Sequence, residues 1–493
     1  MLGLLVALNF LAASKAPPAD TRDIRLLEQT VTHVANSYPM RTAQLGVVIE
    51  EANSGRRLIL RQAGREFAPA SNFKLLDAAA ALSYLGANFR FSTSLLARGS
   101  ISGGILNGDL ILVGGGDPIL TRNDLRAASA VVKKAGIVKV VGTLLVDDSL
   151  FDGQRYGSGW AWDDMPYYYQ PPIQALAVDE GTVGVNVTPG DRVGAAVSAS
   201  LERDPGSMSV VSMALTSKDK NTDDVDCFRS PGSKTIEIVG HVPLSKQTSS
   251  FRCAVEDSSD DAAAVLTQAL SDVGISVGAA ALGEPPKNIE LDISDSGPLP
   301  PALPLRYPGA TVLWAHDSPS VAELLRRMLP ASDNFIAEHL FKMLPVAAFG
   351  KRGSFDGGAS VERLFMGSLG LDPRSLDGGD GSGLSQGDRI TPLDLAEILR
   401  WETRSRSGAV LISALARAGI DGTVRHHLKG SDAVGRVLAK DGYIWHVSTF
   451  SGYALSKHHG LMIFSIMFND VNGPLRPIYN AEDEIVKAAV NMP

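Results

Sequence analysis

The amino-acid sequence predicts an α+β fold in which both ends of the chain build one domain and a long, mainly β insertion interrupts it. Three observations lead to this prediction. A hairpin pattern and an apolar helix precede residue 91, helices and a second hairpin follow residue 306, and short strands with glycine turns lie between them. The 493 residues exceed what one ordinary core organises, so two or three domains are expected.

The first elements are a predicted β-hairpin and a predicted buried helix. Leu45–Glu50 is a continuous β-favouring run, residues 53–55 (Asn-Ser-Gly) form a turn, and Arg57–Leu60 returns. Asn72–Leu85 is rich in alanine and leucine and has no internal glycine or proline. This composition predicts a buried helix with Ser71 at its start.

The middle of the chain is predicted to hold short strands and two helices. The strands are Leu110–Val113, Lys139–Val146, Val183–Thr188 and Ile236–Val242, and the helices are Leu125–Ala135 and Asp261–Val273. A proline-rich stretch at 299–308 predicts a linker. We expect a terminal domain of residues 20–91 and 306–493, an insertion domain of residues 92–175 and 256–305, and a nested small β domain of residues 176–255.

The carboxyl-terminal part is predicted to be helical and then to form a second hairpin. Pro330 separates the first two helices, and Thr391-Pro392 has the pattern of an N-cap followed by proline at the first helical position. The expected helices are Ser318–Leu329, Ser332–Leu344, Thr391–Trp401 and Ala481–Val490, and the expected hairpin strands are His446–Leu455 and Leu461–Phe468.

Composition and charge are those of a soluble globular protein. Hydrophobic residues make up 44% of the chain and charged residues 20%, and the net charge is −8. No dense cluster of lysine and arginine is present, so nucleic acid is not an expected partner. The adjacent pairs His426-His427 and His458-His459 cannot face one ion from a single strand or helix face, so no metal site is expected. No other cofactor is expected either.

The amino terminus has the pattern of an export signal. Leu2–Ala13 is an apolar run too short to span a bilayer, and the small-x-small triplet of residues 14–16 follows it. We therefore expect a cleaved signal peptide at residues 1–16 and a periplasmic or secreted protein; the alternative is an amino-terminal core segment. In an exported chain Cys227 and Cys253 could form a disulfide, and the alternative is two free thiols.

Ser71-Asn72-Phe73-Lys74 is a candidate nucleophile with its base. At a helix start, residues three apart lie on one face, so the lysine amine could take the serine proton. The free N–H groups of the helix start would favour developing negative charge. The spacing also occurs at residues 217–220, in a polar stretch without a following helix, which indicates a solvated loop.

Two further motifs follow in the order of an acyl-serine enzyme. Ser332-Asp333-Asn334 could relay a proton and bind a substrate amide, although a plain helix cap has the same composition. Lys440-Asp441-Gly442 could hold a substrate carboxylate and admit a substrate backbone, although an ordinary charged turn is the simpler interpretation of this motif alone. Together with Ser71 and Lys74 they resemble the set S-x-x-K, S-D-N and K-T-G.

The chain resembles the peptidase family S13 penicillin-binding proteins, which are D-alanyl-D-alanine carboxypeptidases and endopeptidases. The 261 positions between Ser71 and Ser332 fit this family better than a β-lactamase. The resemblance implies a β-lactamase-like transpeptidase fold for the terminal domain, with an antiparallel sheet flanked by helices. The matching segments are residues 69–74 (P-A-S-x-x-K), 114–118 (G-G-G-D-P), 162–165 (W-x-D-M), 332–338 (S-D-N with its helix) and 380–385 (D-G-S-G-L-S).

The resemblance implies roles for the catalytic residues. Ser71 would attack the carbonyl between two D-alanines of a peptidoglycan stem peptide, with Lys74 as its base. Ser332 would relay the proton to the leaving group and Asn334 would orient the substrate. Lys440 would attract the terminal carboxylate. β-Lactams would be covalent inhibitors of such a site.

The same resemblance implies several substrate contacts. The backbone N–H groups of Ser71 and Tyr443 would form the oxyanion hole, and Gly442 would admit the substrate backbone. Asp164, with the tyrosines at 167–169, would contact the third residue of the stem peptide. Without the resemblance, those tyrosines would be interpreted as a surface patch or as packing between domains.

Two positions depart from the family pattern. Asp441 stands where threonine is usual, and an ionised carboxylate cannot donate a hydrogen bond to a substrate carboxylate and repels it. Either the substrate lacks a free carboxylate there, as in cleavage of a cross-link, or Asp441 points elsewhere, or activity is weak. Gln386 stands where arginine is common, so a cation for a diaminopimelate carboxylate is missing.

We therefore expect a penicillin-binding serine carboxypeptidase or endopeptidase acting on peptidoglycan stem peptides. Two alternatives stay open: a β-lactamase or esterase on the same scaffold, and a cell-wall binding protein that has lost efficient chemistry. Asp441 favours the second alternative, and the intact motifs of Ser71, Lys74, Ser332 and Asn334 argue against it. The balance of the two peptidase activities and the presence of a homodimer also stay open.

Overall fold

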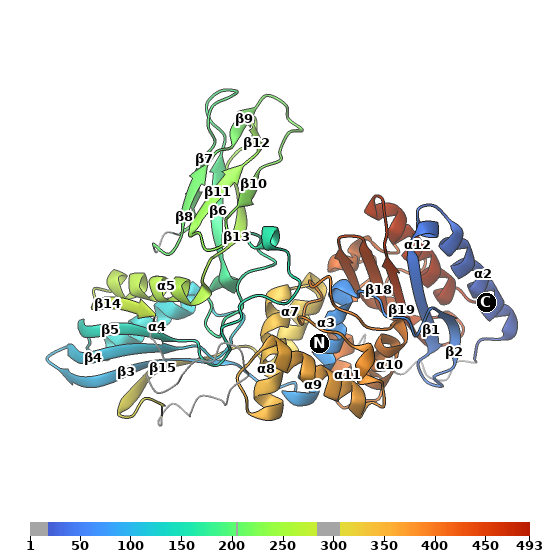
Figure 1. Ribbon diagram of the computed structural model, residues 1–493, viewed down its shortest axis with the longest axis horizontal. Coiled ribbons are helices and arrows are strands. Elements are labelled where there is room, and N and C mark those ends of the chain that lie inside the picture. Colours follow the sequence, from blue (N-terminus) through green and yellow to red (C-terminus); the bar gives the residue numbers. More distant parts are fainter. Residues whose placement is uncertain (1–17, 204–205, 283–305) are drawn as a thin grey trace.

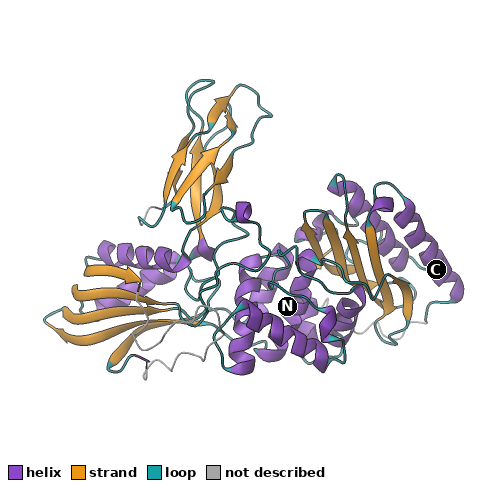
Figure 2. Ribbon diagram, in the orientation of Figure 1, coloured by secondary structure: helices purple, strands orange, loops and turns teal. Residues whose placement is uncertain are grey.

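The computed structural model describes residues 18–203, 206–282 and 306–493, which form three sheet-based regions (Figures 1 and 2). The first is a six-stranded antiparallel sheet built from both ends of the chain, in the order β16-β17-β18-β19-β1-β2. Its strands are β1 (Gln44–Glu51), β2 (Arg57–Arg61), β16 (Ala416–Arg417), β17 (Val437–Ile444), β18 (Val447–Leu455) and β19 (Leu461–Asn469). We call it the terminal sheet.

Helices cover both faces of the terminal sheet (Figure 1). Val47 and Ile49 of β1 pack against α2 (Thr21–Asn36) and α12 (Leu475–Val490), whereas Val48 between them packs into the core on the opposite face. This alternation follows from the two-residue period of a strand. The helices on the Val48 side are α3 (Phe73–Tyr84), α7 (Val321–Ala331), α8 (Asn334–Phe349), α9 (Phe355–Ser368), α10 (Pro392–Glu402) and α11 (Gly408–Ala414).

Helix α3 lies at the centre of this helical layer. Its residues Phe73–Leu82 are all buried, and Ala78–Ala81 have no exposed surface. A helix that is apolar on every side can be stable only when protein surrounds it, and small alanine side chains let neighbouring helices approach closely. The surrounding core therefore fixes the position of the residues at the start of α3.

The second region is a five-stranded sheet in the order β14-β5-β4-β3-β15. The pairs β4–β5 and β5–β14 are parallel, and β3 pairs antiparallel with β4 and β15. Two helices cover one face (Figure 1). The elements are β3 (Ser92–Ser102), β4 (Ile105–Val113), β5 (Lys139–Asp147), β14 (Ser276–Leu282), β15 (Ala310–Asp317), α4 (Arg122–Lys134) and α5 (Ser258–Asp272).

Strand β15 corrects one assignment made from the sequence. Residues 310–317 were expected in the terminal domain, but β15 pairs along its length with β3 and so belongs to the five-stranded sheet. The two paired strands are more than 200 residues apart in the chain, so no local sequence pattern indicates that they pair. The remaining domain boundaries stay predictions, and the boundary at residue 305 lies outside the described residues.

The third region is a small β unit that projects from the other two (Figure 1). Buried valine and isoleucine side chains form its own core. Cys227 and Cys253 are buried there as free thiols, so the disulfide expected as one alternative is absent. Its strands are β6 (Thr182–Thr188), β7 (Ser198–Leu201), β8 (Ser209–Ser212), β9 (Leu215–Ser217), β10 (Asp226–Phe228), β11 (Thr235–Val239), β12 (His241–Pro243) and β13 (Ser249–Ala254).

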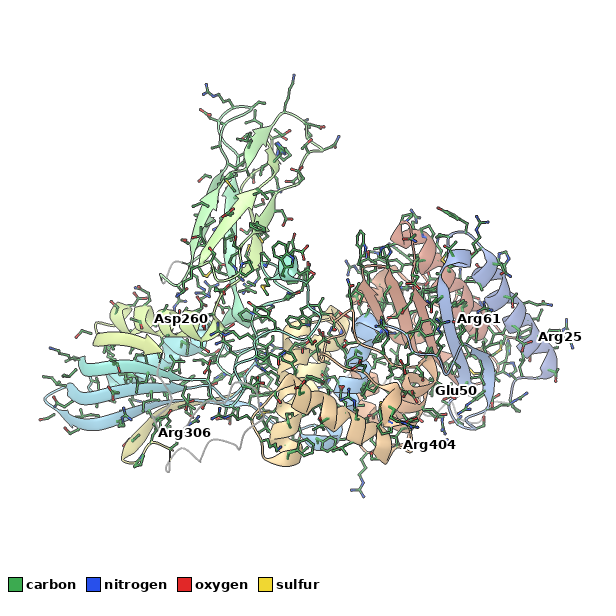
Figure 3. The ribbon with its side chains drawn as sticks, in the orientation of Figure 1. Arg25, Glu50, Arg61, Asp260, Arg306 and Arg404 are labelled. Carbon is green, nitrogen blue, oxygen red and sulfur yellow. The ribbon has the colours of Figure 1, made fainter. Side chains whose placement is uncertain are left out.

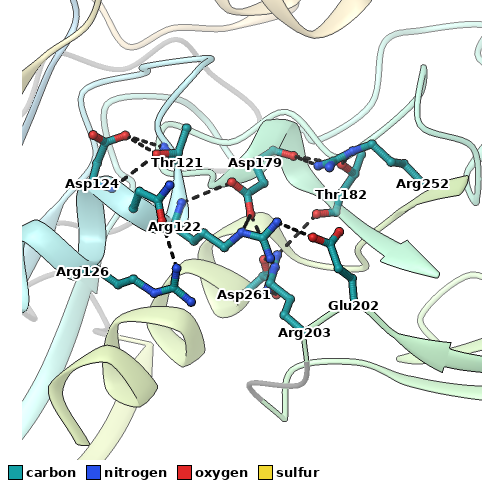
Figure 4. Close-up of polar contacts among 11 residues, drawn as sticks. Thr121, Arg122, Asp124, Arg126, Asp179, Thr182, Glu202, Arg203, Arg252 and Asp261 are labelled. Carbon is teal, nitrogen blue, oxygen red and sulfur yellow. Dashed lines mark hydrogen bonds and ion pairs between the residues drawn. The ribbon is translucent and has the colours of Figure 1, made fainter. Parts of the chain in front are cut away.

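Charged side chains join the small β unit to the helices of the five-stranded sheet. Arg203 donates two hydrogen bonds to Asp261 of α5, and Arg122 of α4 forms ion pairs with Asp179 and Glu202 (Figure 4). Asp260, which follows Asp257 at the start of α5, accepts from Lys234 at 2.6 Å near the base of the small β unit (Figure 3). These contacts are hydrogen bonds between charged groups, which have a defined geometry. They therefore help to fix how the small β unit is joined to α4 and α5.

Most predicted elements are present, with shifted ends. Both predicted hairpins and the predicted helices around α3, α4, α5, α7, α8 and α10 are confirmed. The final helix begins at Leu475, earlier than predicted, Pro330 lies in the last turn of α7, and the predicted strand Ile236–Val242 divides into β11 and β12. The expected signal peptide and most of the expected linker lie outside the described residues.

Within the described ranges, none of the helices combines the length and the apolar character needed to cross a membrane. One aromatic side chain joins several parts of the helical layer. Phe341 of α8 is fully buried, and its ring lies against Gly358 of α9 and Gly381. It therefore links two helices and a loop.

Replacing Phe341 with alanine should lower the free energy of unfolding by about 3–5 kcal/mol, since the substitution leaves a cavity where three segments meet. Leu364→Ala, on an exposed position of α9, should change it by less than about 0.5 kcal/mol. Urea unfolding followed by circular dichroism would measure both. Equal, small effects of the two substitutions would contradict the central position of Phe341.

Candidate active site

The candidate nucleophile lies at the start of α3. A short 3-10 turn, η2 (Ala70–Asn72), precedes the helix, and Ala70 has a φ of 46°. An alanine in the left-handed region is uncommon and is maintained only where surrounding structure over-determines it. Ser71 follows directly and is partly exposed, so its hydroxyl lies at the surface of an otherwise buried helix.

Lys74 lies one turn after Ser71 and is completely buried. Its Nζ donates to Ser71 Oγ at 3.1 Å, to Asn334 Oδ1 at 2.7 Å and to the Ser382 carbonyl oxygen at 2.7 Å. Burial and the nearby ammonium of Lys440 lower the pKa of Lys74 to about 7. A sizeable fraction of the amine is therefore uncharged at neutral pH and could accept a proton from Ser71.

Ser332 and Asn334 lie at the turn between α7 and α8. Ser332 ends α7 with a φ of 57°, and Asp333 caps α8 by accepting from the Ile336 N–H at 3.0 Å. Asn334 accepts from Lys74 and donates through Nδ2 to the Tyr169 carbonyl oxygen at 3.0 Å. The motif is thus both a helix cap and part of the site.

Strand β17 borders the site with an open edge. Strand β16 pairs only with Leu438 and Ala439, which leaves Lys440–Ile444 without a partner on that side among the described strands. A Cβ on Gly442 would lie 2.8 Å from the backbone nitrogen of Ser71. Glycine is therefore required for this close approach of β17 to the candidate nucleophile.

Lys440 and Asp441 are paired with one another. Lys440 Nζ lies 3.1 Å from Asp441 Oδ1 and also donates to the Asp441 carbonyl oxygen. Asp441 Oδ1 accepts a second bond from Thr423, in the 3-10 turn η6 (Thr423–His426). Burial opposes ionisation, but Lys440 and Thr423 hold the pKa of Asp441 below its usual value. For the amine of Lys440, burial opposes the charged form and lowers the pKa.

The remaining predicted residues lie around this centre. Asp164 accepts from the Tyr169 hydroxyl at 2.9 Å, and the backbone carbonyl of Tyr169 in turn accepts from Asn334. Gln386 is exposed, and its carbonyl oxygen accepts from Arg389. Tyr443 is 46% exposed and, with Trp445, lines a cavity of about 250 Å³ at the end of β17.

A layer of buried carboxyl groups behind Lys74 was not predicted from the sequence. Glu338 accepts from the backbone N–H groups of Gly381 and Ser382, and so holds the loop whose carbonyl oxygen binds Lys74. Burial raises the pKa of Glu338 to about 8, and burial also raises the pKa of Asp77 and Glu362 well above the usual range. Burial therefore favours the uncharged form of these carboxyl groups.

Two carboxyl groups of this layer could have been recognised from their positions in the sequence. Asp77 is the one carboxyl in the apolar run of α3 after Lys74, and Glu338 lies one helical turn after Asn334. Thr423 could not have been recognised in this way, because only the folded chain brings η6 beside β17. Within the described ranges, no group of three histidine, cysteine or carboxylate side chains could hold a metal ion.

The arrangement has the parts that acyl transfer requires. A hydroxyl lies beside an amine that can take its proton, at the start of a helix and beside an open strand edge. An amide side chain and a lysine–carboxylate pair complete the border of the site. This chemistry is compatible with cleavage of a peptide bond through a covalent ester.

Comparisons with known proteins agree with this interpretation. Residues 27–299 and 303–491 match the D-Ala-D-Ala carboxypeptidase 3 (S13) family. A D-alanyl-D-alanine carboxypeptidase from Actinomadura sp. is 31% identical over 95% of this chain and 86% of its own length. The D-alanyl-D-alanine carboxypeptidase DacB of Haemophilus influenzae is 27% identical over 82% of this chain and 80% of its own length.

Solved structures share the fold. Penicillin binding protein 4 (dacB) from Haemophilus influenzae superposes with a TM-score of 0.81 at 23% identity, over 93% of this chain and 99% of that one. A predatory peptidoglycan endopeptidase from Bdellovibrio bacteriovorus gives 0.52 at 15% identity, over 90% and 93%. The expected fold class is confirmed, and the chain belongs to the D-Ala-D-Ala carboxypeptidase 3 (S13) family of serine peptidases.

Proposed function

We propose that this protein hydrolyses D-alanyl peptide bonds of peptidoglycan stem peptides through an acyl-enzyme on Ser71. The observation that carries the proposal is the 3.1 Å contact between Ser71 Oγ and the buried amine of Lys74. A serine hydroxyl is a weak nucleophile until a base takes its proton, and an amine with a pKa near 7 is suited to that task at neutral pH.

In the first step Ser71 Oγ forms a bond to the carbonyl carbon while its proton passes to Lys74 Nζ. The negative charge on the carbonyl oxygen is then stabilised by the backbone N–H groups of Ser71 and Tyr443. The close approach of Gly442 to the Ser71 nitrogen supports this assignment, since the two chain segments lie side by side.

In the second step the amide bond breaks and its nitrogen leaves as an amine. The proton held by Lys74 reaches that nitrogen through the Ser332 hydroxyl, and Asn334 orients the substrate amide. A water molecule then attacks the Ser71 ester, which releases the shortened peptide and restores the hydroxyl. The position of Asn334, bonded at once to Lys74 and to Tyr169, supports its role in holding both the base and the substrate side of the site.

Relatives support the class of ligand. The Haemophilus influenzae protein that shares this fold has also been solved in complex with a β-lactam. We propose that β-lactams acylate Ser71 here as well, because their strained amide resembles the scissile bond. Contact of Asp164 and Gln386 with the stem peptide, a cleaved signal peptide, a periplasmic or secreted location and a homodimer remain predictions.

Incubation with benzylpenicillin should add one penicilloyl group to the protein, as measured by intact-mass spectrometry. Ser71→Ala should abolish the adduct while the variant remains folded, as circular dichroism would show, because the other two acceptors of the Lys74 amine are kept. A folded parent that forms no adduct would favour a cell-wall binding protein. Rapid release of the adduct would favour a β-lactamase or esterase instead.

Gly442→Ala should slow acylation by about 100-fold, since its Cβ would push β17 away from the Ser71 nitrogen and weaken the oxyanion contacts. The matched control is Gly64→Ala, whose Cβ would meet no atom within 4 Å. Stopped-flow acylation by a chromogenic β-lactam would compare the two variants. Equal rates in both would remove the proposed oxyanion site at β17.

The acylation rate constant should rise with pH around a midpoint of about 7, because only the uncharged form of Lys74 accepts the Ser71 proton and that form predominates above its pKa. The rate would be measured under pseudo-first-order conditions across that midpoint. A rate independent of pH over about two units on either side would exclude Lys74 as the base.

A further inference from the structure

A buried polar network lies behind β17, on the face of the terminal sheet that α12 covers. Asp441 is directly opposite Phe450 in the β17–β18 ladder, and the His427 ring stacks on Phe450 with a centroid distance of 4.2 Å. Directly opposed residues of antiparallel strands share a face, so Asp441 and His427 lie on the same side of the sheet. We define the outer-face network as Asp441, Thr423, His427, Glu482 and Asp483.

His427 lies at the centre of the outer-face network. It is 1% exposed, its Nδ1 lies 2.8 Å from Asp483 Oδ1, and its Nε2 lies 3.9 Å from Glu482 Oε2. Asp483 and Glu482 are held in turn by the Leu428 N–H and the Ser448 hydroxyl, each at 2.8 Å. His427 therefore faces two carboxyl groups of α12, and its ring stacks on Phe450, the residue directly opposite Asp441 of β17.

The charges of the network depend on one another. Burial alone would lower the pKa of His427, but Asp483, Glu482 and Asp441 raise it above the usual value. Burial raises the pKa of Glu482 to about 7. His427 acts with Lys440 and Thr423 to hold the pKa of Asp441 down. Tyr479, whose ring centroid lies 4.9 Å from that of His427, is the other titratable neighbour on α12.

We propose that His427 is a specificity-determining positioning residue which, acting through Asp441, makes the site favour scissile bonds whose leaving amine carries no free carboxylate. The proposal rests on the acyl-transfer function proposed above. An ionised Asp441 can only accept hydrogen bonds, and it already binds Lys440. A substrate carboxylate would have to displace Asp441 from Lys440 and would meet a like charge. A neutral carboxamide at that position avoids both costs.

Two peptides that differ in one group test the proposal. Both contain an acyl-D-Ala-D-Ala sequence, one with a free terminal carboxylate and the other with a carboxamide, and kcat/KM is measured for release of the last residue. The parent should prefer the carboxamide by at least about tenfold, and this ratio should stay constant between about pH 5.5 and pH 7.5, since Asp441 stays ionised.

His427→Gln removes the titratable imidazole and should raise the pKa of Asp441. The preference for the carboxamide should then fall at least about threefold on acidification to about pH 5.5, because a protonated Asp441 donates a hydrogen bond to the carboxylate. In an Asp441→Asn background the preference should be nearly lost at every pH, and His427→Gln should change it no further. Such non-additivity is expected only if His427 acts through Asp441.

Two variants serve as controls. His427→Arg supplies a planar cation that can stack on Phe450 and should retain the preference. His426→Gln changes the exposed neighbour and should have no effect. The proposal is overturned if His427→Gln leaves the ratio unchanged at both pH values, or if it lowers kcat/KM for both peptides equally in both Asp441 backgrounds, as loss of packing alone would.

A second readout does not depend on catalysis. If the parent cleaves neither peptide, the proposed function fails, and thermal unfolding of the four variants of the His427–Asp441 cycle decides the inference. Non-additive shifts of the unfolding midpoint at neutral pH are expected from the coupling between the two charges. Additive shifts would show that His427 and Asp441 act independently and would overturn the proposal.

Discussion

The buried amine of Lys74 is the constraint on which the rest of the site depends. An uncompensated ammonium in a protein interior is costly, and here three oxygen atoms accept from it. They belong to the turn η2, to the start of α8 and to the loop at Ser382, so the amine is satisfied only when these segments meet. Burial supplies the chemistry at the same time, because it lowers the pKa of the amine.

Residues of the insertion also help to position the groups that bind Lys74. The Tyr169 carbonyl oxygen binds Asn334, and the Trp160 indole donates to Asp380 at 2.7 Å. Asp380 in turn accepts from the backbone of the loop that carries Ser382. The segment between β5 and β6 therefore supports both α8 and that loop, which ties the position of the base to the insertion.

The two faces of β17 have different surroundings. Gly442 approaches the Ser71 nitrogen on the side of the helical layer, whereas Asp441 shares its face with Phe450 and the outer-face network. Asp441 thus points away from the Ser71 side while its carboxylate still reaches Lys440 at the strand edge. Of the three alternatives raised by the missing threonine, this geometry fits the one in which Asp441 points away from the nucleophile, with its carboxylate bound to Lys440 and Thr423.

The sequence by itself determined the local features. The hairpins, α3 with Ser71 and Lys74 one turn apart, and the helix cap at Ser332–Asn334 follow from patterns within a few residues. Only the tertiary structure decided that β15 joins β3, that Asp164 binds the Tyr169 hydroxyl, and that Asp441 meets Thr423. Those contacts join segments far apart in the chain, and their direction depends on register and packing, which local propensities do not encode.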